Sequence, residues 1–212
     1  MLLQEDKLKL EAYVDNLIDN LKKETNRAKQ NGQLSGEKLL DKVTSMTVNK
    51  LTPESKMILS SVYNMMMNHT LEDKYFSESS NKAKLYSADI LKELNNKFDF
   101  TVPSEINYEK SHNEFEKLIA SGVVVLGGGA GIGTIIHFSI KKLNHAFPGV
   151  GIAVIIVGLM CYLLKNIWSS SSSNIDEIIN EYFATVKKSL FAWVESIETY
   201  YDEAVAKIKE RG

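Results

Sequence analysis

Apolar residues recur every three or four positions through most of this chain, which is the pattern of amphipathic helices. The first such segment covers about residues 3–29, and its apolar residues form one stripe: Leu10, Val14, Leu17 and Leu21. Shorter segments with the same spacing follow at about 35–49 and 82–98. Few segments alternate in the manner of β-strands. The pattern therefore predicts an all-α protein built as a helical bundle.

A helix start is expected at Thr52, Pro53 and Glu54. A threonine can cap the first turn with its hydroxyl, and proline is favoured at the first helical position. We therefore expect one helix to end near residue 49 and a new one to begin at Thr52. The new helix would carry Met57, Ile58, Val62 and Met65 to Met67.

The C-terminal part of the chain has the most regular pattern. It follows five consecutive serines, Ser169 to Ser173. Its apolar residues are spaced by steps of three or four: Ile175, Ile179, Tyr182, Val186, Leu190, Trp193, Ile197, Tyr200, Ala204 and Ile208. These steps are close to those of a coiled-coil seam. The sequence predicts a flexible serine joint followed by one long amphipathic helix.

Two uncharged segments occupy the middle of the chain. Residues 118–138 and 147–164 contain no charged side chain over 21 and 18 positions, and the short polar stretch SIKKLNHA joins them. At 1.5 Å per residue, helices of these lengths would span about 31 and 27 Å, close to the hydrocarbon thickness of a bilayer. We expect an antiparallel helical hairpin that works in or on a membrane. Three parts are thus predicted: an N-terminal bundle (1–116), the apolar hairpin (117–168), and the serine linker with its C-terminal helix (169–212).

Two other interpretations of residues 118–164 compete with the membrane hairpin: the buried centre of a soluble bundle, and a dinucleotide-binding turn. The turn requires G-x-G-x-x-G, and no frame beginning at Gly127, Gly128 or Gly129 completes it. No acidic residue to hold a ribose occurs between Glu116 and Asp176. The sequence therefore argues against a dinucleotide site.

The glycine content distinguishes between the membrane-hairpin and the soluble-core interpretations of residues 118–164. Nine of the twelve glycines lie between Gly122 and Gly158, and in a water-soluble helix each costs about 1 kcal/mol relative to alanine. In a membrane, small residues four apart let helices approach closely, while aromatic and lysine side chains anchor the ends at the headgroups. The candidate contact residues are Gly127, Gly129, Gly131, Gly133, Lys141, Lys142, Tyr162, Lys165 and Trp168.

Composition narrows the function classes. The formal net charge is −2, without the clustered basic face of a nucleic-acid-binding protein. Cys161 is the single cysteine, so no intrachain disulfide can form. The first ten residues, MLLQEDKLKL, are not a classical secretory signal. We find no nucleophile paired with a base, no phosphate loop and no cysteine cluster, and we therefore expect no enzyme, no cofactor and no metal site.

A helical bundle that is interrupted by a glycine-rich apolar hairpin and closed by a long C-terminal helix resembles the α-helical pore-forming toxins of the cytolysin A type. The resemblance covers the arrangement of residues 118–164 and their helical flanks. It implies a hairpin that is sheltered against the bundle in water and swings out to enter membranes.

The sequence thus predicts a non-enzymatic, membrane-active protein, integral or conditionally inserted, whose hairpin enters a bilayer to form a pore or remodel it. The expected partners are lipid and either further copies of the chain or another helical protein. The alternative is a permanently hairpin-anchored membrane protein whose helical flanks bind protein partners. Inclusion-membrane proteins of intracellular bacteria look similar to this alternative.

Overall fold

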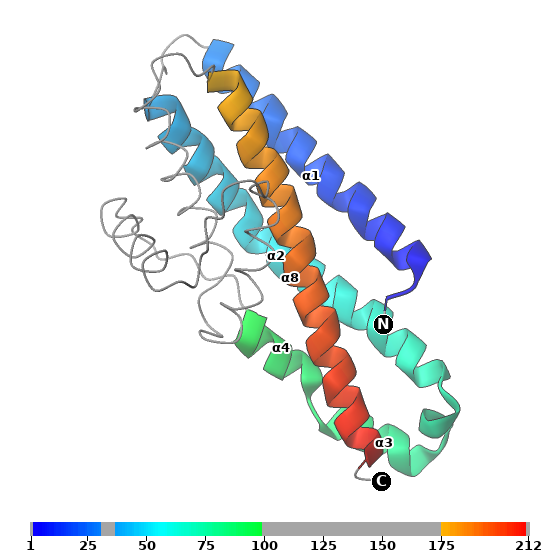
Figure 1. Ribbon diagram of the computed structural model, residues 1–212. Helices are drawn as coiled ribbons and strands as arrows, with labels where there is room; N and C mark the ends of the chain where they lie inside the picture. The colour runs from blue at the N-terminus through cyan, green and yellow to red at the C-terminus, as the bar shows by residue number, and fades with distance from the viewer. Residues whose placement is uncertain (1, 31–36, 99–174, 211–212) are drawn as a thin grey trace, which may run out of the picture.

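The computed structural model of the 212-residue chain describes residues 2–30, 37–98 and 175–210. All regular structure in these ranges is helical, which confirms the predicted all-α bundle (Figure 1). The long helices are α1 (Gln4–Gln30), α2 (Glu37–Glu72) and α8 (Ile175–Glu210), and the shorter elements are the 3-10 helix η1 (Lys74–Ser77), α3 (Ser79–Ser87) and α4 (Ile90–Phe98).

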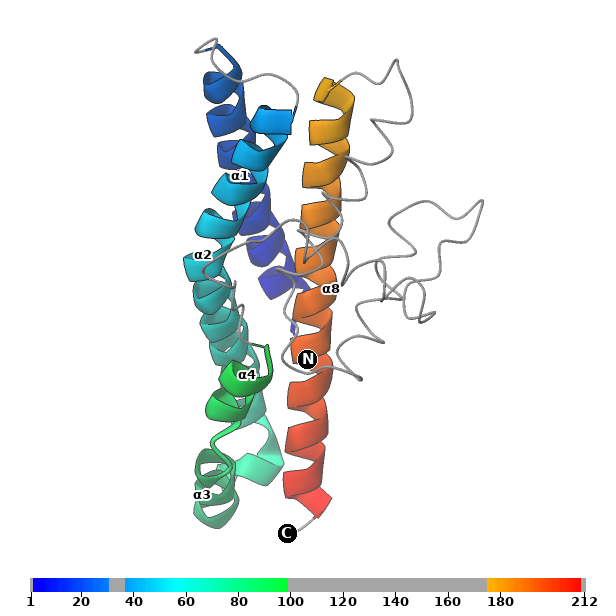
Figure 2. The same ribbon diagram turned by 90° about the vertical axis from the view of Figure 1, so that its left-hand side faces the viewer.

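The long helices lie side by side, with α1 antiparallel to both α2 and α8. The last turn of α1 meets the start of α8 through an ion pair between Lys29 and Asp176, whereas Leu2, just before α1, bonds to Glu198 further along α8. Figures 1 and 2 show that α1 covers one half of the length of α2 and α8, and that α3 and α4 lie along the other half. Helices α2 and α8 therefore pack with α1 along one half of the bundle and with α3 and α4 along the other half.

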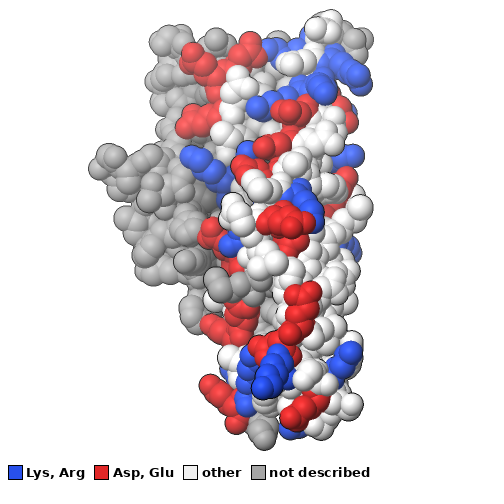
Figure 3. Space-filling view, turned by 90° about the vertical axis from the view of Figure 1, so that its right-hand side faces the viewer, with Lys and Arg blue, Asp and Glu red and all other residues white. Residues whose placement is uncertain are grey.

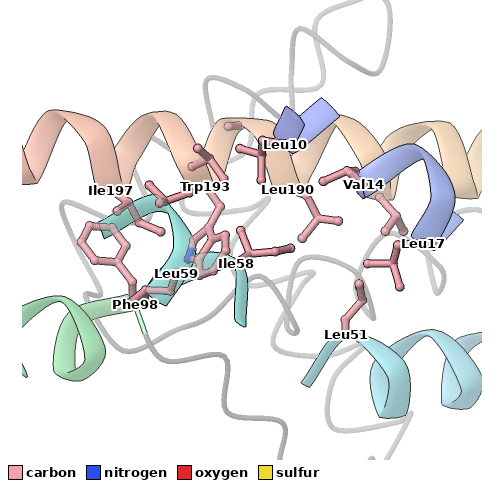
Figure 4. Packing of buried hydrophobic residues seen from close by; sticks show 14 of the residues in the cluster. Leu10, Val14, Leu17, Leu51, Ile58, Leu59, Phe98, Leu190, Trp193 and Ile197 are labelled. Carbon is pink, nitrogen blue, oxygen red and sulfur yellow. The ribbon is translucent and has the colours of Figure 1, made fainter. Parts of the chain in front are cut away.

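The predicted stripe of α1 is confirmed, because Leu10, Val14, Leu17 and Leu21 are each at most 6% exposed. They join a core shared by α1, α2, α4 and α8. Figure 4 shows Trp193 of α8 lying among residues of α2 and Phe98 of α4. Each large apolar side chain buried in this way contributes roughly 1.5 to 3 kcal/mol to folding, so the core holds together helices from both ends of the sequence.

The expected helix start at Thr52 is wrong. Helix α2 runs without interruption from Glu37 to Glu72, with Pro53 inside it. Proline removes the helix hydrogen bond to the Asn49 carbonyl. Two neighbouring hydroxyls donate to other backbone carbonyls: Thr52 to Val48 at 2.9 Å, and Ser55 to Thr52 at 3.0 Å. Of the apolar residues expected in the new helix, Met57 is 58% exposed, whereas Ile58 and Val62 are buried.

The single helix expected at 82–98 is also wrong, because two helices meet there. α3 ends at Ser87 and α4 begins at Ile90, and Asp89 between them has a positive φ of 45°. A residue with positive φ cannot continue a right-handed helix. The apolar spacing continues across this break with Leu85, Ile90 and Leu94 buried, which explains why the pattern did not reveal it.

The predicted seam of α8 holds as far as Ile197 and then shifts by one residue. Tyr201 is 1% exposed, whereas the expected Tyr200 is only half-buried. A straight helix has 3.6 residues per turn and drifts about 20° per heptad from a 3.5-residue seam. The buried face of α8 is also wider than a coiled-coil seam, since Phe183, Ala192 and Val194 are buried beside it.

The predicted membrane location is contradicted. Among the described residues, no helix combines the length and the apolar character needed to cross a bilayer. This finding overturns the description of the chain as an integral or inserted membrane protein and as a transmembrane, pore-forming toxin. The two uncharged segments, 118–138 and 147–164, lie outside the described residues.

Candidate functional site: the closing helix α8

Helix α8 joins the two ends of the described chain. It contacts α1, α2, α3 and α4, and its inward side chains are buried: Ile179, Tyr182, Phe183, Val186, Leu190, Trp193, Val194, Ile197 and Tyr201. The helices before residue 99 and the helix after residue 174 therefore share one core. Because α8 packs against helices from the other end of the sequence, it is the candidate functional element.

Polar contacts fasten α8 to α1 at three levels. At the start of α8, Lys29 pairs with Asp176. About three turns further along, Lys187 pairs with Asp15 and lies 4.0 Å from Glu11. These charges are partly exposed, so each pair contributes at most about 1 kcal/mol. Their main effect is to set the register between the two helices.

The third polar contact between α8 and α1, at Glu198, is more buried than the other two. The Leu2 amide donates to Oε1 of Glu198 at 2.8 Å, and the Lys7 ammonium lies 3.6 Å from Oε2 of the same carboxylate. Glu198 is only 8% exposed. Hydrogen bonds to charged groups are stronger than neutral ones, and a buried carboxylate is costly when it loses its partners. This contact fixes the start of α1.

Tyr201 fastens α8 to α2. Its hydroxyl donates to Oγ1 of Thr70 at 2.9 Å, and its ring meets the ring of Tyr63 edge-on with centroids 6.0 Å apart. Burial is the main cause that raises the pKa of Tyr201 to about 12. At the far end, Lys209 donates to Asp73 at 2.6 Å, and this hydrogen bond lowers the pKa of the Asp73 carboxyl.

Helix α4 meets α8 at Tyr200. The Tyr200 hydroxyl donates to Glu93 at 2.7 Å, the Phe98 ring lies edge-on with centroids 5.8 Å apart, and the Lys97 ammonium lies 4.2 Å from the Tyr200 ring centroid. The described chain thus stops at Phe98, beside Tyr200, and resumes at Ile175. These two points are separated by about 25 residues of α8, or roughly 37 Å at 1.5 Å per residue.

A groove of about 220 Å³ lies between the start of α1 and α8. Leu2, Leu10, Phe191 and Val194 give it an apolar lining, and Lys7, Glu11, Glu195 and Glu198 supply the charged groups. At least two of these four charges, Lys7 and Glu198, already face each other. The groove can accept a small apolar group, and its lining contains neither histidine nor cysteine.

A second polar cluster joins α1 to α2. Nε2 of His69 lies 2.7 Å from the carboxylate of Asp6, and Nδ1 lies 3.8 Å from Glu72. In the part of the chain that the structure describes, no group of three or more histidine, cysteine, aspartate or glutamate residues has an arrangement that could hold a metal ion. The cluster fastens α1 to α2.

The predicted contact residues fall in the part of the chain that is not described: Gly127, Gly129, Gly131, Gly133, Lys141, Lys142, Tyr162, Lys165 and Trp168. Their arrangement stays a prediction. Glu198, Tyr201 and Phe98, which take part in the contacts between α8 and the other helices, were not expected as a site. Only the apolar spacing of α8 could have indicated Tyr201, and only that of residues 82–98 could have indicated Phe98. No sequence signal pairs Glu198 with Leu2.

No protein-family model, curated protein or solved structure matches this chain. The resemblance to cytolysin A-type toxins therefore stays a prediction, and function is argued from the chain's own residues.

Proposed function

We propose that this is a non-enzymatic protein that acts on lipid bilayers. Its bundle, closed by α8, holds both ends of the segment 99–174 and brings the two uncharged runs, 118–138 and 147–164, into contact with a bilayer surface. The observation that carries the proposal is the pair of charge-free runs of 21 and 18 residues, inserted between helices that share one core. Such runs favour transfer from water into an apolar phase. The proposed activity is the perturbation of a bilayer that the protein meets, and neither residence in a membrane nor a pore is part of it.

The closed bundle can make this contact without opening. Residues 99–117 and 165–174 connect the described helices to the uncharged runs. Fully extended, these connections of 19 and 10 residues reach about 63 and 33 Å. Their sum exceeds the roughly 37 Å that separates Phe98 from Ile175 along α8. Both runs can therefore meet the same patch of bilayer while α8 stays packed.

The alternative function, in which helical flanks bind protein partners, has less support. It requires an apolar face of α8 that is open to a partner. The seam from Ile179 to Ile197 packs instead against the protein's own helices, and each of the predicted seam residues in that stretch is at most 6% exposed.

Deletion of residues 118–164 tests the proposal. It leaves 29 of the 76 residues between Phe98 and Ile175, which can still span the distance between these ends. We expect the full chain to co-sediment with vesicles of phosphatidylcholine, which carries no net charge, and the deletion variant to stay in the supernatant. Unchanged cooperative unfolding of the variant is the control for an intact bundle. Equal sedimentation of both proteins would refute the proposal.

A further inference from the structure

Charge is unevenly distributed along α1. From Gln4 to Asp19 the acidic residues predominate: Glu5, Asp6, Glu11, Asp15 and Asp19, against Lys7 and Lys9. From residue 20 to Gln30 the basic residues predominate: Lys22, Lys23, Arg27 and Lys29, against Glu24. Cations near a helix C-terminus interact favourably with the helix dipole, but this effect fades beyond the last turn. It accounts for Arg27 and Lys29 and leaves Lys22 and Lys23 unexplained.

Ion pairing differs between the two halves of α1. In the acidic half, Glu5 pairs with Lys9, and Asp15 pairs with Lys187 of α8. In the basic half, Lys29 pairs with Asp176. Within the described ranges, Lys22, Lys23 and Arg27 have no ion pair, and the last two are exposed. These three residues are named the basic end of α1.

The basic end lies at the end of the bundle where α8 begins, as the Lys29–Asp176 pair requires. On the face shown in Figure 3, Lys and Arg side chains gather near the top, which is the end of the bundle where α1 ends in Figure 1. Only ten residues separate Leu164, the end of the second uncharged run, from Ile175. A bilayer touched by that run therefore lies within about 33 Å of the start of α8, by the reach of an extended chain.

We propose that the basic end of α1, Lys22, Lys23 and Arg27, docks on anionic phospholipid headgroups. This inference rests on the proposed function and names the lipid class and the face of the bundle that meets it. Phosphate groups are natural partners of lysine and arginine, and basic residues near an anionic membrane surface are attracted to it. Nucleic acid fits less well, because the cluster is small and the chain has a net charge of −2.

Two double variants with the same net charge as each other test the proposal. The first carries K23Q and R27Q at the basic end. The matched control carries K82Q and K207Q on α3 and α8, which are likewise exposed and have no ion pair within the described ranges. Each variant thus removes two positive charges from exposed helix positions. Binding is measured by co-sedimentation with vesicles of phosphatidylcholine alone and of phosphatidylcholine with phosphatidylserine, at low and high salt.

We expect K23Q/R27Q to bind phosphatidylserine vesicles about 30-fold more weakly than the parent at low salt, from the usual attraction per basic residue. The control should bind within about 3-fold of the parent, and high salt should remove the difference because it screens the charges. Equal losses of vesicle binding in both variants, or unchanged binding of K23Q/R27Q, would overturn the assignment of the basic end to anionic lipid. An acidic protein would then be the partner of these cations. Failure of the parent to bind either kind of vesicle would refute the proposed function itself.

Discussion

The backbone amide of Leu2 donates a 2.8 Å hydrogen bond to the carboxylate of Glu198, a residue 196 positions further along the chain. Both residues are buried, with exposed fractions of 5% and 8%. The contact ties the start of α1 to the middle of α8, so the two ends of the described chain depend on each other for stability.

Replacement of Glu198 by alanine should therefore destabilise the bundle. The variant loses a charged acceptor and leaves the Leu2 amide without its partner, which costs about 1.5 to 3 kcal/mol. Urea unfolding followed by circular dichroism measures the change in the free energy of unfolding. Glu203→Ala, at an exposed position of the same helix, is the control and should change it by less than about 0.5 kcal/mol. Equal values for the two variants would show that the contact contributes nothing.

Pro53→Ala should stabilise the protein. Alanine restores a backbone N–H that can donate to the carbonyl of Asn49, and it removes the clash of the proline ring with that carbonyl, together worth about 3 kcal/mol. The lost rigidity of the unfolded chain offsets up to about 1 kcal/mol of this. A net gain of about 2 kcal/mol is expected by chemical denaturation. A loss of stability would mean that the hydroxyls of Thr52 and Ser55 depend on the proline.

Stability should fall at alkaline pH because of buried tyrosine. The pKa of Tyr201 is raised to about 12, mainly by burial, whereas an unfolded tyrosine titrates near 10. A raised folded pKa gives stability that is complete below pH 10 and is lost as the pH rises toward 12. Urea unfolding between pH 8 and 12 should show this loss, and Tyr201→Phe should make it shallower. An identical pH dependence of the two proteins would contradict the assignment to Tyr201.

The apolar spacing was sufficient to predict the helical class and most of the core, because burial of one face is a local property of a helix. Leu10 and Val14 needed no knowledge of their neighbours to be placed inside. The continuity of α2 was harder to predict, because Pro53 is typical of a helix start and yet lies inside α2. Asp89 breaks a helix that the apolar pattern treats as unbroken.

The site was less predictable than the fold. The contact between Leu2 and Glu198 depends on how α1 and α8 align, and no spacing in a single helix encodes that alignment. The expected membrane location came from the uncharged runs, their glycines and the aromatic and lysine residues at their ends. It is contradicted because no described helix has both the length and the apolar character to cross a bilayer. The activity that we propose is accordingly contact with a bilayer surface.

Tryptophan fluorescence tests the central claim most directly. The chain has two tryptophans: Trp168, next to the second uncharged run, and Trp193, which is 3% exposed in the core. Variant W193F leaves Trp168 as the only emitter, and W168F leaves Trp193. Vesicles with brominated acyl chains quench tryptophan only at close range. We predict quenching of Trp168 in W193F and unchanged emission of Trp193 in W168F. Unquenched Trp168 would contradict contact with the bilayer, and equal quenching of both would contradict a bundle that stays closed.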